Sequence, residues 1–179
     1  MTTPTQGPPE ADPQPVAEAD LADLLDRARI TDLISQLGRD LDRRNFDGLR
    51  DLFTPDATVN TPGGTAHGHD ALVGQARRRH STDAGIQHIV TNLLIDRDGD
   101  DRVTARANLL VSFARTGAAD PAPFLLGEVY DFELRRTPAG WLLTSLTSTP
   151  IWTLNRPAAQ AVSPVKAPGP VKAQTASPV

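Results

Sequence analysis

The second half of the chain carries four strand-length patterns in succession, and this run limits the possible folds more than any other feature. β-Branched and aromatic residues mark the patterns, which cover residues 86–95, 102–113, 124–135 and 141–152. Short turn sequences separate them, and the tightest turn covers residues 137–140. Because strands joined by short turns pair antiparallel, the sequence predicts one largely antiparallel sheet.

A long helical pattern precedes these strands and occupies residues 20–43. Its apolar residues recur every three or four positions, which is typical of an amphipathic helix with one buried stripe. The predicted stripe consists of Leu21, Leu24, Leu25, Ala28, Leu33, Ile34, Leu37 and Leu41. Asp20 is a suitable N-cap. Asp40 and Asp42 lie near the C-terminal end, where a carboxylate opposes the helix dipole, so each needs another reason to be there.

Shorter patterns fill the region between the long helix and the strands. Residues 46–53 and 69–79 are predicted to be helical, and Pro55 is expected to end the first of these helices. Residues 57–61 form a short predicted strand, and residues 65–68 an extended piece after a turn. Helices first and strands last indicate an α+β fold, with the helices packed on one face of a curved sheet.

Length and composition limit the folded part to one domain. The chain has 179 residues, which suggests a single domain. Residues 1–18 and 156–179 are rich in Pro and Ala and hold few large side chains, so they cannot offset the entropy lost on ordering. We therefore expect two disordered extensions around a domain at residues 19–155.

Charge and residue usage exclude several classes of function. The net charge of −4 gives no support to nucleic-acid binding, and the absence of cysteine excludes disulfides and thiolate metal sites. No apolar run is long enough to span a membrane, and no signal sequence is evident, so a cytoplasmic protein is expected. His67 and His69 lack a third ligand at suitable spacing, so no metal is expected.

The stretch 85–96 contains two polar residues that a buried strand should not hold without a reason. These are His88 and Asn92, set among Ile, Val and Leu. Buried polar groups need partners, and histidine is the side chain best suited to move protons near neutral pH. If His88 points into the fold, strict alternation places Val90 and Asn92 on the same side. We expect His88 to face a pocket, with Asp42 as its partner.

Several short segments resemble SnoaL-like domains of the nuclear-transport-factor-2-like (NTF2-like) superfamily, which includes polyketide cyclases and scytalone dehydratase. The segments are 41–49, 52–57, 68–72, 87–92 and 140–141, in the expected order. The resemblance covers about residues 20–155. It implies a cone in which a curved sheet wraps around the long first helix, with two shorter helices and an apolar pocket. The same scaffold supports several enzyme classes and non-catalytic modules, so fold alone does not fix function.

The resemblance transfers only some functional residues. Asp42 and His88 match the aspartate and histidine that scytalone dehydratase pairs, but its other functional groups fall on Leu41, Thr61, Tyr130 and either Ser112 or Phe113. The functional residues of ketosteroid isomerase fall on Thr61, Leu37 and Phe132, which argues against that activity. Arg106 and Asp131 could supply two members of the epoxide-hydrolase group, and the third is not found.

A His–Asp pair in an apolar pocket suits removal of a proton next to a carbonyl. The carboxylate fixes the imidazole tautomer and raises its basicity, and the other ring nitrogen acts as the base. The enolate could then expel a β-hydroxyl group or close a ring by aldol attack, and its oxygen needs a hydrogen-bond donor. The candidate substrate-binding residues are Tyr130, Asn92, Asn60, Ser112, Leu37 and Trp152.

Two functions stay open on the sequence. The first is a cofactor-independent dehydratase, cyclase or isomerase that acts on a hydrophobic, carbonyl-bearing metabolite such as a polyketide intermediate. The second is a non-catalytic module for a small ligand or a protein partner, in which His88 and Asp42 only tie the helix to the sheet. A cavity that His88 reaches would favour the enzyme.

The second long strand pattern, at residues 102–113, also bears on assembly. Thr104, Arg106 and Asn108 are expected on one face of the sheet, and Val103, Ala105 and Ala107 on the other. The outer face needs cover, and the resemblance implies paired faces, so a homodimer is expected.

Overall fold

The computed structural model describes residues 18–80, 84–115 and 123–155. The predicted terminal extensions lie outside the described residues, except that Glu18 already belongs to the first helix. No helix in the described part of the chain is long and apolar enough to cross a membrane.

The elements follow the predicted order of helices first and long strands last. They are α1 (Glu18–Asp42), η1 (Asp47–Asp51), β1 (Phe53–Thr61), β2 (Gly64–His67), α2 (Gly68–Arg79), β3 (Ala84–Arg97), β4 (Arg102–Arg115), β5 (Phe124–Thr137) and β6 (Gly140–Leu154). The six strands form one sheet in the order β2-β1-β6-β5-β4-β3. All neighbours pair antiparallel except β1 and β6, which are parallel. The predicted α+β class and the mixed sheet are confirmed.

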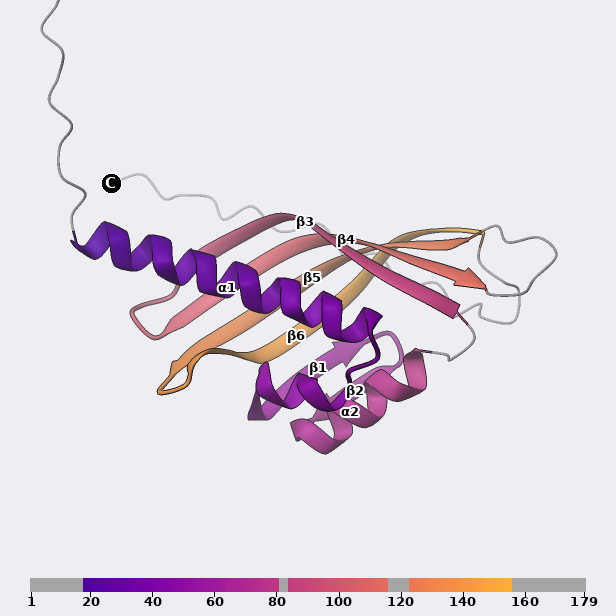
Figure 1. Ribbon diagram of the computed structural model, residues 1–179, viewed down its shortest axis with the longest axis horizontal. Helices are drawn as coiled ribbons and strands as arrows, with labels where there is room; N and C mark the ends of the chain where they lie inside the picture. The colour runs from indigo at the N-terminus through magenta and orange to yellow at the C-terminus, as the bar shows by residue number, and fades with distance from the viewer. Residues whose placement is uncertain (1–17, 81–83, 116–122, 156–179) are drawn as a thin grey trace, which may run out of the picture.

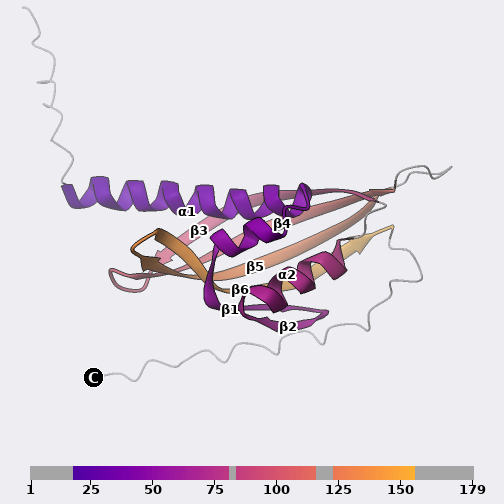
Figure 2. The same cartoon turned by 60° about the horizontal axis from the view of Figure 1, so that its bottom comes forward.

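The helices occupy separate parts of the sheet. Figures 1 and 2 show α1 lying along the long strands and α2 next to β1 and β2. Four apolar side chains of α1 are buried against the sheet, namely Ile30, Ile34, Leu37 and Leu41. β4 alternates as predicted, with Val103, Ala105 and Ala107 buried and Thr104, Arg106 and Asn108 exposed.

The predicted buried stripe of α1 is wrong in the first three turns. Leu21, Leu24 and Leu25 are 53%, 59% and 47% exposed, and Ala28 is exposed as well. In this part of the helix the sheet-facing positions hold Asp23 and Asp26, which bind arginines of the strands, so the leucines lie elsewhere. The helix also begins before Asp20, which is therefore not its N-cap.

Two shorter elements also differ from the prediction. The segment predicted as a helix at residues 46–53 forms only the 3₁₀ turn η1, and β1 starts at Phe53 instead of residue 57. Pro55 lies inside this strand. The pairing of β1 with β6 shifts register between Phe53 and Thr58, and a bulge of this kind tolerates the missing amide hydrogen of proline.

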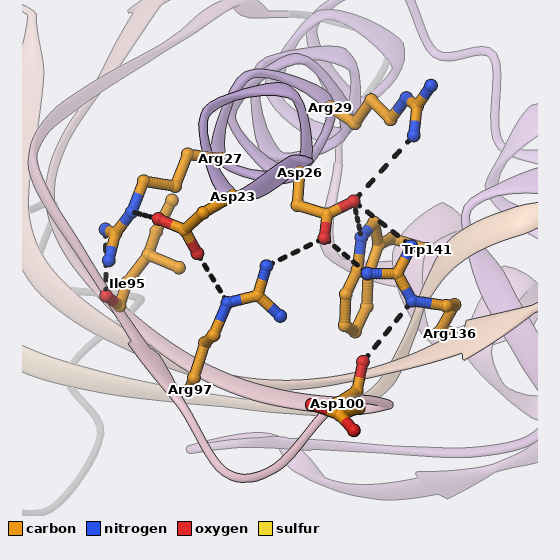
Figure 3. A network of polar contacts seen from close by, with 9 residues as sticks. All are labelled: Asp23, Asp26, Arg27, Arg29, Ile95, Arg97, Asp100, Arg136 and Trp141. Atoms are coloured by element: carbon orange, nitrogen blue, oxygen red, sulfur yellow. Dashed lines mark hydrogen bonds and ion pairs between the residues drawn. The ribbon is translucent and has the colours of Figure 1, made fainter. Parts of the chain in front are cut away.

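A polar network joins the first half of α1 to three strands (Figure 3). Asp26 is only 4% exposed, and its carboxylate accepts hydrogen bonds from Arg136 of β5, Arg97 of β3 at 2.8 Å and the indole of Trp141 of β6 at 3.1 Å. The Arg136 guanidinium also lies over the Trp141 ring, 4.5 Å from its centroid. Hydrogen bonding to Arg136 holds the pKa of Asp26 well below its usual range. The network therefore holds the Asp26 carboxylate of α1 in its ionised form between the helix and the strands.

Candidate functional site

A cavity of about 120 Å³ lies beyond the Asp26 network, at the C-terminal half of α1. Side chains from α1, η1, β1, α2 and the long strands form its wall, and most of them are apolar. Leu37 and Leu41 come from α1, Leu72 from α2 and Val111 from β4. Arg79 also lines the cavity and is exposed, so the cavity meets solvent beside it. An apolar cavity with a few polar groups is typical of a small-molecule site.

The polar groups of the wall come from four strands and one helix with its C-cap residue. They are Thr61, Gln75, Arg79, His80, His88, Glu128, Tyr130 and Ser148. Gln75 and Arg79 both donate to Thr61 Oγ1, at 3.4 and 2.8 Å, and so support the β1 end of the wall. The remaining groups include every titratable side chain that could take part in proton transfer within this wall.

The predicted partners His88 and Asp42 are in direct contact. Asp42 Oδ1 accepts a hydrogen bond from His88 Nδ1 at 2.7 Å and another from the main-chain nitrogen of His88 at 2.9 Å. Because a carboxylate only accepts, the proton of the neutral ring lies on Nδ1. The His88 side chain is 3% exposed and lines the cavity, so Nε2 is the nitrogen that remains for a ligand. Asp42 ends α1, and its bond to β3 explains a carboxylate at this position.

A second histidine lies against the first. The His80 ring centroid is 5.8 Å from that of His88 and 5.6 Å from that of Phe46, so the three rings form a series. His80 caps α2, and its Nδ1 donates to the Ala76 carbonyl at 2.7 Å. Burial lowers the pKa of His80 and favours the neutral ring. A neutral His80 supports the His88 ring without adding a second charge.

A buried carboxyl group faces the same cavity from β5. Glu128 is 5% exposed, and its Oε1 accepts a hydrogen bond from Ser148 Oγ of β6 at 2.8 Å. Burial raises the pKa of Glu128, because desolvation disfavours the charged form. Leu126, Glu128 and Tyr130 all line the cavity, as alternation along a strand requires. Burial likewise raises the pKa of Tyr130, which keeps its phenol protonated.

The structure brings together only some of the residues predicted to bind substrate. Leu37 and Tyr130 line the cavity with His88. Asn60, Ser112 and Trp152 are not part of its wall. Asn60 instead accepts a hydrogen bond from Thr65 of the β1–β2 hairpin at 2.8 Å, and Ser112 lies between the inward-facing Val111 and Phe113. Trp152 is half-exposed and covers Gly127.

The prediction that Asn92 faces inward is wrong. The pairing of β3 with β4 shifts register between Thr91 and Leu94, and Asn92 adopts a left-handed backbone conformation with φ of 52°. A bulge breaks the alternation of a strand, and asparagine tolerates this conformation better than most residues. Asn92 is therefore exposed, while Val90 remains partly buried as expected.

Sequence analysis did not identify Glu128, Ser148 or His80 as parts of the site. The one available signal for Glu128 was a carboxylate that alternates with Leu126 and Tyr130 on one face of a strand pattern. In the described part of the chain, no group of three or more His, Asp or Glu side chains is arranged to hold a metal ion.

Solved structures and a curated relative resemble this chain over most of its folded part. An uncharacterized protein of Mycobacterium tuberculosis is 28% identical over 134 residues, which cover 72% of this chain and 88% of the relative. A hexachlorocyclohexane dehydrochlorinase of Novosphingobium barchaimii is 23% identical with a TM-score of 0.68, over 81% of this chain and 99% of that one. A scytalone-dehydratase-like protein of Novosphingobium aromaticivorans is 19% identical with a TM-score of 0.67, over 75% and 89% of the two chains.

The structural neighbours share the cone-shaped NTF2-like fold that the sequence predicted. The sequence profile of the SnoaL-like domain matches residues 22–147, which include most of α1, all of β1 to β5 and the first half of β6. The chain therefore belongs to the SnoaL-like domain family.

Proposed function

We propose that the protein is a cofactor-independent lyase that removes a proton next to a carbonyl group of a small hydrophobic metabolite. The observation that carries this proposal is the His88 ring, bonded to Asp42 through Nδ1 in the wall of an apolar cavity. A carboxylate on one ring nitrogen holds the tautomer in which Nε2 is free of a proton, and it stabilises the imidazolium that forms on proton transfer.

The wall also supplies groups for the enolate that proton removal creates. An enolate oxygen needs a hydrogen-bond donor in place before the reaction. The phenol of Tyr130 and the hydroxyl of Ser148 lie in the same wall, on β5 and β6 at paired positions of the sheet. The Ser148 hydroxyl already donates its one hydrogen to Glu128, so the Tyr130 phenol is the donor that can turn to the substrate oxygen, and the apolar surroundings strengthen such a bond.

The cavity volume limits the substrate. A cavity of about 120 Å³ is close to the roughly 150 Å³ that accommodates one benzene ring. We infer a substrate of about one ring or a short branched chain, with any further part extending past Arg79 to solvent. A small polyketide intermediate fits this description.

The names of two fold neighbours support a lyase over a cyclase or an isomerase. One neighbour is named a dehydrochlorinase and the other is scytalone-dehydratase-like, and both names describe eliminations. The second candidate remains a ligand-binding module. Its support is the second bond of Asp42, to the main chain of His88, because that bond would tie α1 to β3 without any catalysis.

Hydrogen exchange tests the proposal without requiring the natural leaving group. We would follow, by NMR in D₂O, exchange of the hydrogens next to the carbonyl of small ketones. His88→Ala and Asp42→Asn should lower the exchange rate by about 10²–10⁴-fold while the proteins stay folded. His67→Ala is the matched control, because His67 is exposed on β2 and bonds Thr58. Binding without exchange by the unmutated protein would move the assignment to the binding module.

We also propose a homodimer. Several large apolar side chains of α1, β3 and β6 are exposed, namely Leu21, Leu24, Leu25, Ile89, Leu94, Ile151, Trp152 and Leu154. Exposed apolar surface of this kind favours association. Sedimentation equilibrium should give twice the chain mass, and a monomer at micromolar concentration would contradict the proposal.

A further inference from the structure

The proposed base leaves one titratable group of the cavity without a role. Glu128 is only 5% exposed, and it lines the same cavity as His88. Among the described residues, no arginine or lysine bonds it, and its carboxyl group has two hydroxyl partners, Ser148 at 2.8 Å and the phenol of Tyr130. A buried carboxyl group without a bonded cation is costly when ionised, so a purely structural explanation accounts for it poorly.

The hydrogen bond from Ser148 also orients the carboxyl group. Ser148 Oγ donates to Glu128 Oε1, so Oε1 acts as the acceptor and Oε2 is left to carry a proton. Burial favours that protonated form and raises the pKa of Glu128, although the hydrogen bond from Ser148 and the positive charge of Arg79 oppose it. Glu128 can therefore present an acidic O–H to a ligand in the cavity, where His88 presents a basic nitrogen.

Resting on the proposed function, we propose that Glu128 is the acid that protonates a departing hydroxyl group, so that the substrates are β-hydroxy carbonyl compounds and the reaction is dehydration. Two observations carry the proposal. Glu128 and the His88–Asp42 pair line one cavity from different strands, and Ser148 fixes one oxygen of the carboxyl group.

The reaction balances with these two groups alone. His88 Nε2 takes the proton from the carbon next to the carbonyl, and the electron pair of that C–H bond forms the C=C bond. The C–O bond to the β-hydroxyl breaks, its electron pair stays on oxygen, and the Glu128 proton converts the leaving group to water. The protein is left with protonated His88 and ionised Glu128. Transfer of one proton from His88 to Glu128 through water restores the starting state.

The leaving group decides whether an acid is needed. Hydroxide is a poor leaving group and must be protonated as it departs, whereas chloride or acetate departs as a stable anion. A lyase that expels chloride therefore needs only the base. An acid aimed into the cavity of this protein indicates an alcohol as the group that leaves.

The test compares two leaving groups on one carbon skeleton. The probes are the aldol adduct of acetone and benzaldehyde, which is a β-hydroxy ketone, and its acetate ester. Both give the same conjugated ketone, which absorbs in the near ultraviolet. Glu128→Gln should lower kcat/KM for the alcohol by about 100-fold or more and change kcat/KM for the ester by less than about threefold. His88→Ala should lower both values.

Two further variants keep the test decisive. Glu133→Gln is the matched control, because Glu133 lies on the same strand with an exposed side chain. Glu128→Asp keeps a carboxylic acid that is one methylene shorter. On the alcohol, Glu128→Asp should be clearly more active than Glu128→Gln. On the ester, the two variants should be nearly equal. This comparison still applies if the glutamine variant unfolds.

The outcomes separate this inference from the proposed function. Equal losses on the alcohol and the ester in Glu128→Gln would overturn the acid role and leave Glu128 as a structural group. Hydrogen exchange without elimination of either leaving group would overturn the inference and leave the His88 base in place. Absence of exchange in the unmutated protein would remove the proposed function, and the inference with it.

Discussion

Two carboxyl groups of this protein are equally buried and have opposite chemistry. Asp26 is 4% exposed and Glu128 is 5% exposed. Asp26 accepts hydrogen bonds from two guanidiniums and an indole, and its pKa falls. The partners of Glu128 are two neutral hydroxyls, those of Ser148 and Tyr130, and burial raises its pKa. Burial alone therefore does not decide the charge of a carboxyl group, because the bonded partners can reverse its effect.

The two environments also separate structure from chemistry along the fold. The Asp26 network (Figure 3) joins the first half of α1 to β3, β5 and β6 and fills the space between them. Glu128 faces the cavity near the other end of α1, and the described partners of its carboxyl group are the hydroxyls of Ser148 and Tyr130. A carboxylate bonded to cations holds the fold together, and a carboxyl group bonded only to neutral hydroxyls beside a cavity is available to a ligand.

Removing the charge of Asp26 should have the largest effect on stability. Asp26→Asn replaces an acceptor of three donors with an amide whose nitrogen faces guanidinium groups. It leaves Arg136 without its carboxylate partner, while Arg97 keeps its ion pair with Asp23. We expect a loss of about 3 kcal/mol in the free energy of unfolding, at the lower end for a broken buried pair because both arginines are partly solvated. Urea denaturation at neutral pH measures it.

Asp32→Asn is the control for this substitution, because Asp32 lies on the exposed side of the same helix. Its free energy of unfolding should stay within about 0.5 kcal/mol of the unmutated protein. Equal free energies of unfolding for Asp26→Asn and Asp32→Asn would show that the Asp26 network contributes little to stability. Asp26 would then not be a structural carboxylate, in contradiction to the role given to it here.

The pH dependence of stability should have opposite signs for the two groups. The folded pKa of Asp26 lies below the ordinary value of 3.8, so its contribution to stability is present above pH 3.8 and is lost as the pH falls further. The folded pKa of Glu128 lies above the ordinary value of 4.5, so the stability gained from its protonated form is present below pH 4.5 and is lost as the pH rises.

Unfolding curves over a range of pH check both signs. The stability gap between the unmutated protein and Asp26→Asn should narrow as the pH falls below 3.8. The free energy of unfolding of the unmutated protein relative to Glu128→Gln should fall as the pH rises above 4.5. The stability difference between the unmutated protein and each variant could instead rise with pH in both cases. Glu128 would then be ionised in the folded protein and could not act as an acid.

The contrast between these carboxyl groups also shows what the sequence could and could not predict. The order of helices and strands follows from local periodicity, and α1 and β3 to β6 were predicted with small errors at their ends. Asp42 and His88 were found because each breaks a local rule, one as a carboxylate at a helix C-terminus and the other as an imidazole in an apolar strand.

The remaining features depend on contacts that no local pattern contains. Asp26 lies 110 residues from Arg136 in the chain, and this ion pair turned the first three turns of α1 away from the predicted leucine stripe. The position of Asn92 depended on a bulge, which shifts side chains between the faces of a strand. Glu128 could be related to the cavity only after the register of β5 and β6 was known.

Replacing both Glu128 and Ser148 with apolar residues should change the free energy of unfolding little. The double variant Glu128→Leu with Ser148→Ala removes a buried carboxyl group together with its recorded donor, and loss of both partners of a buried hydrogen bond is often nearly neutral. We expect a free energy of unfolding within about 1 kcal/mol of the unmutated protein. A loss of about 3 kcal/mol, as for Asp26→Asn, would make Glu128 a second structural carboxylate.

The smallest expected effects come from removing a single neutral donor beside each carboxyl group. Trp141→Phe deletes the indole N–H that bonds Asp26 and keeps an aromatic ring beneath the Arg136 guanidinium, while Ser148→Ala deletes the hydroxyl that bonds Glu128. Each substitution should cost about 1 kcal/mol of stability.

The pKa values of the two carboxyl groups should respond differently to these substitutions, and carbon-13 NMR titration can follow them. The indole is one of several donors to Asp26, so the pKa of Asp26 should stay well below its usual range. The Ser148 hydroxyl lowers the pKa of Glu128 against burial, so its loss should raise that pKa further and strengthen the acid form. If the pKa of Glu128 falls in Ser148→Ala, a cation has taken the place of the hydroxyl. Both carboxyl groups would then be bonded to cations, and the contrast between them would be lost.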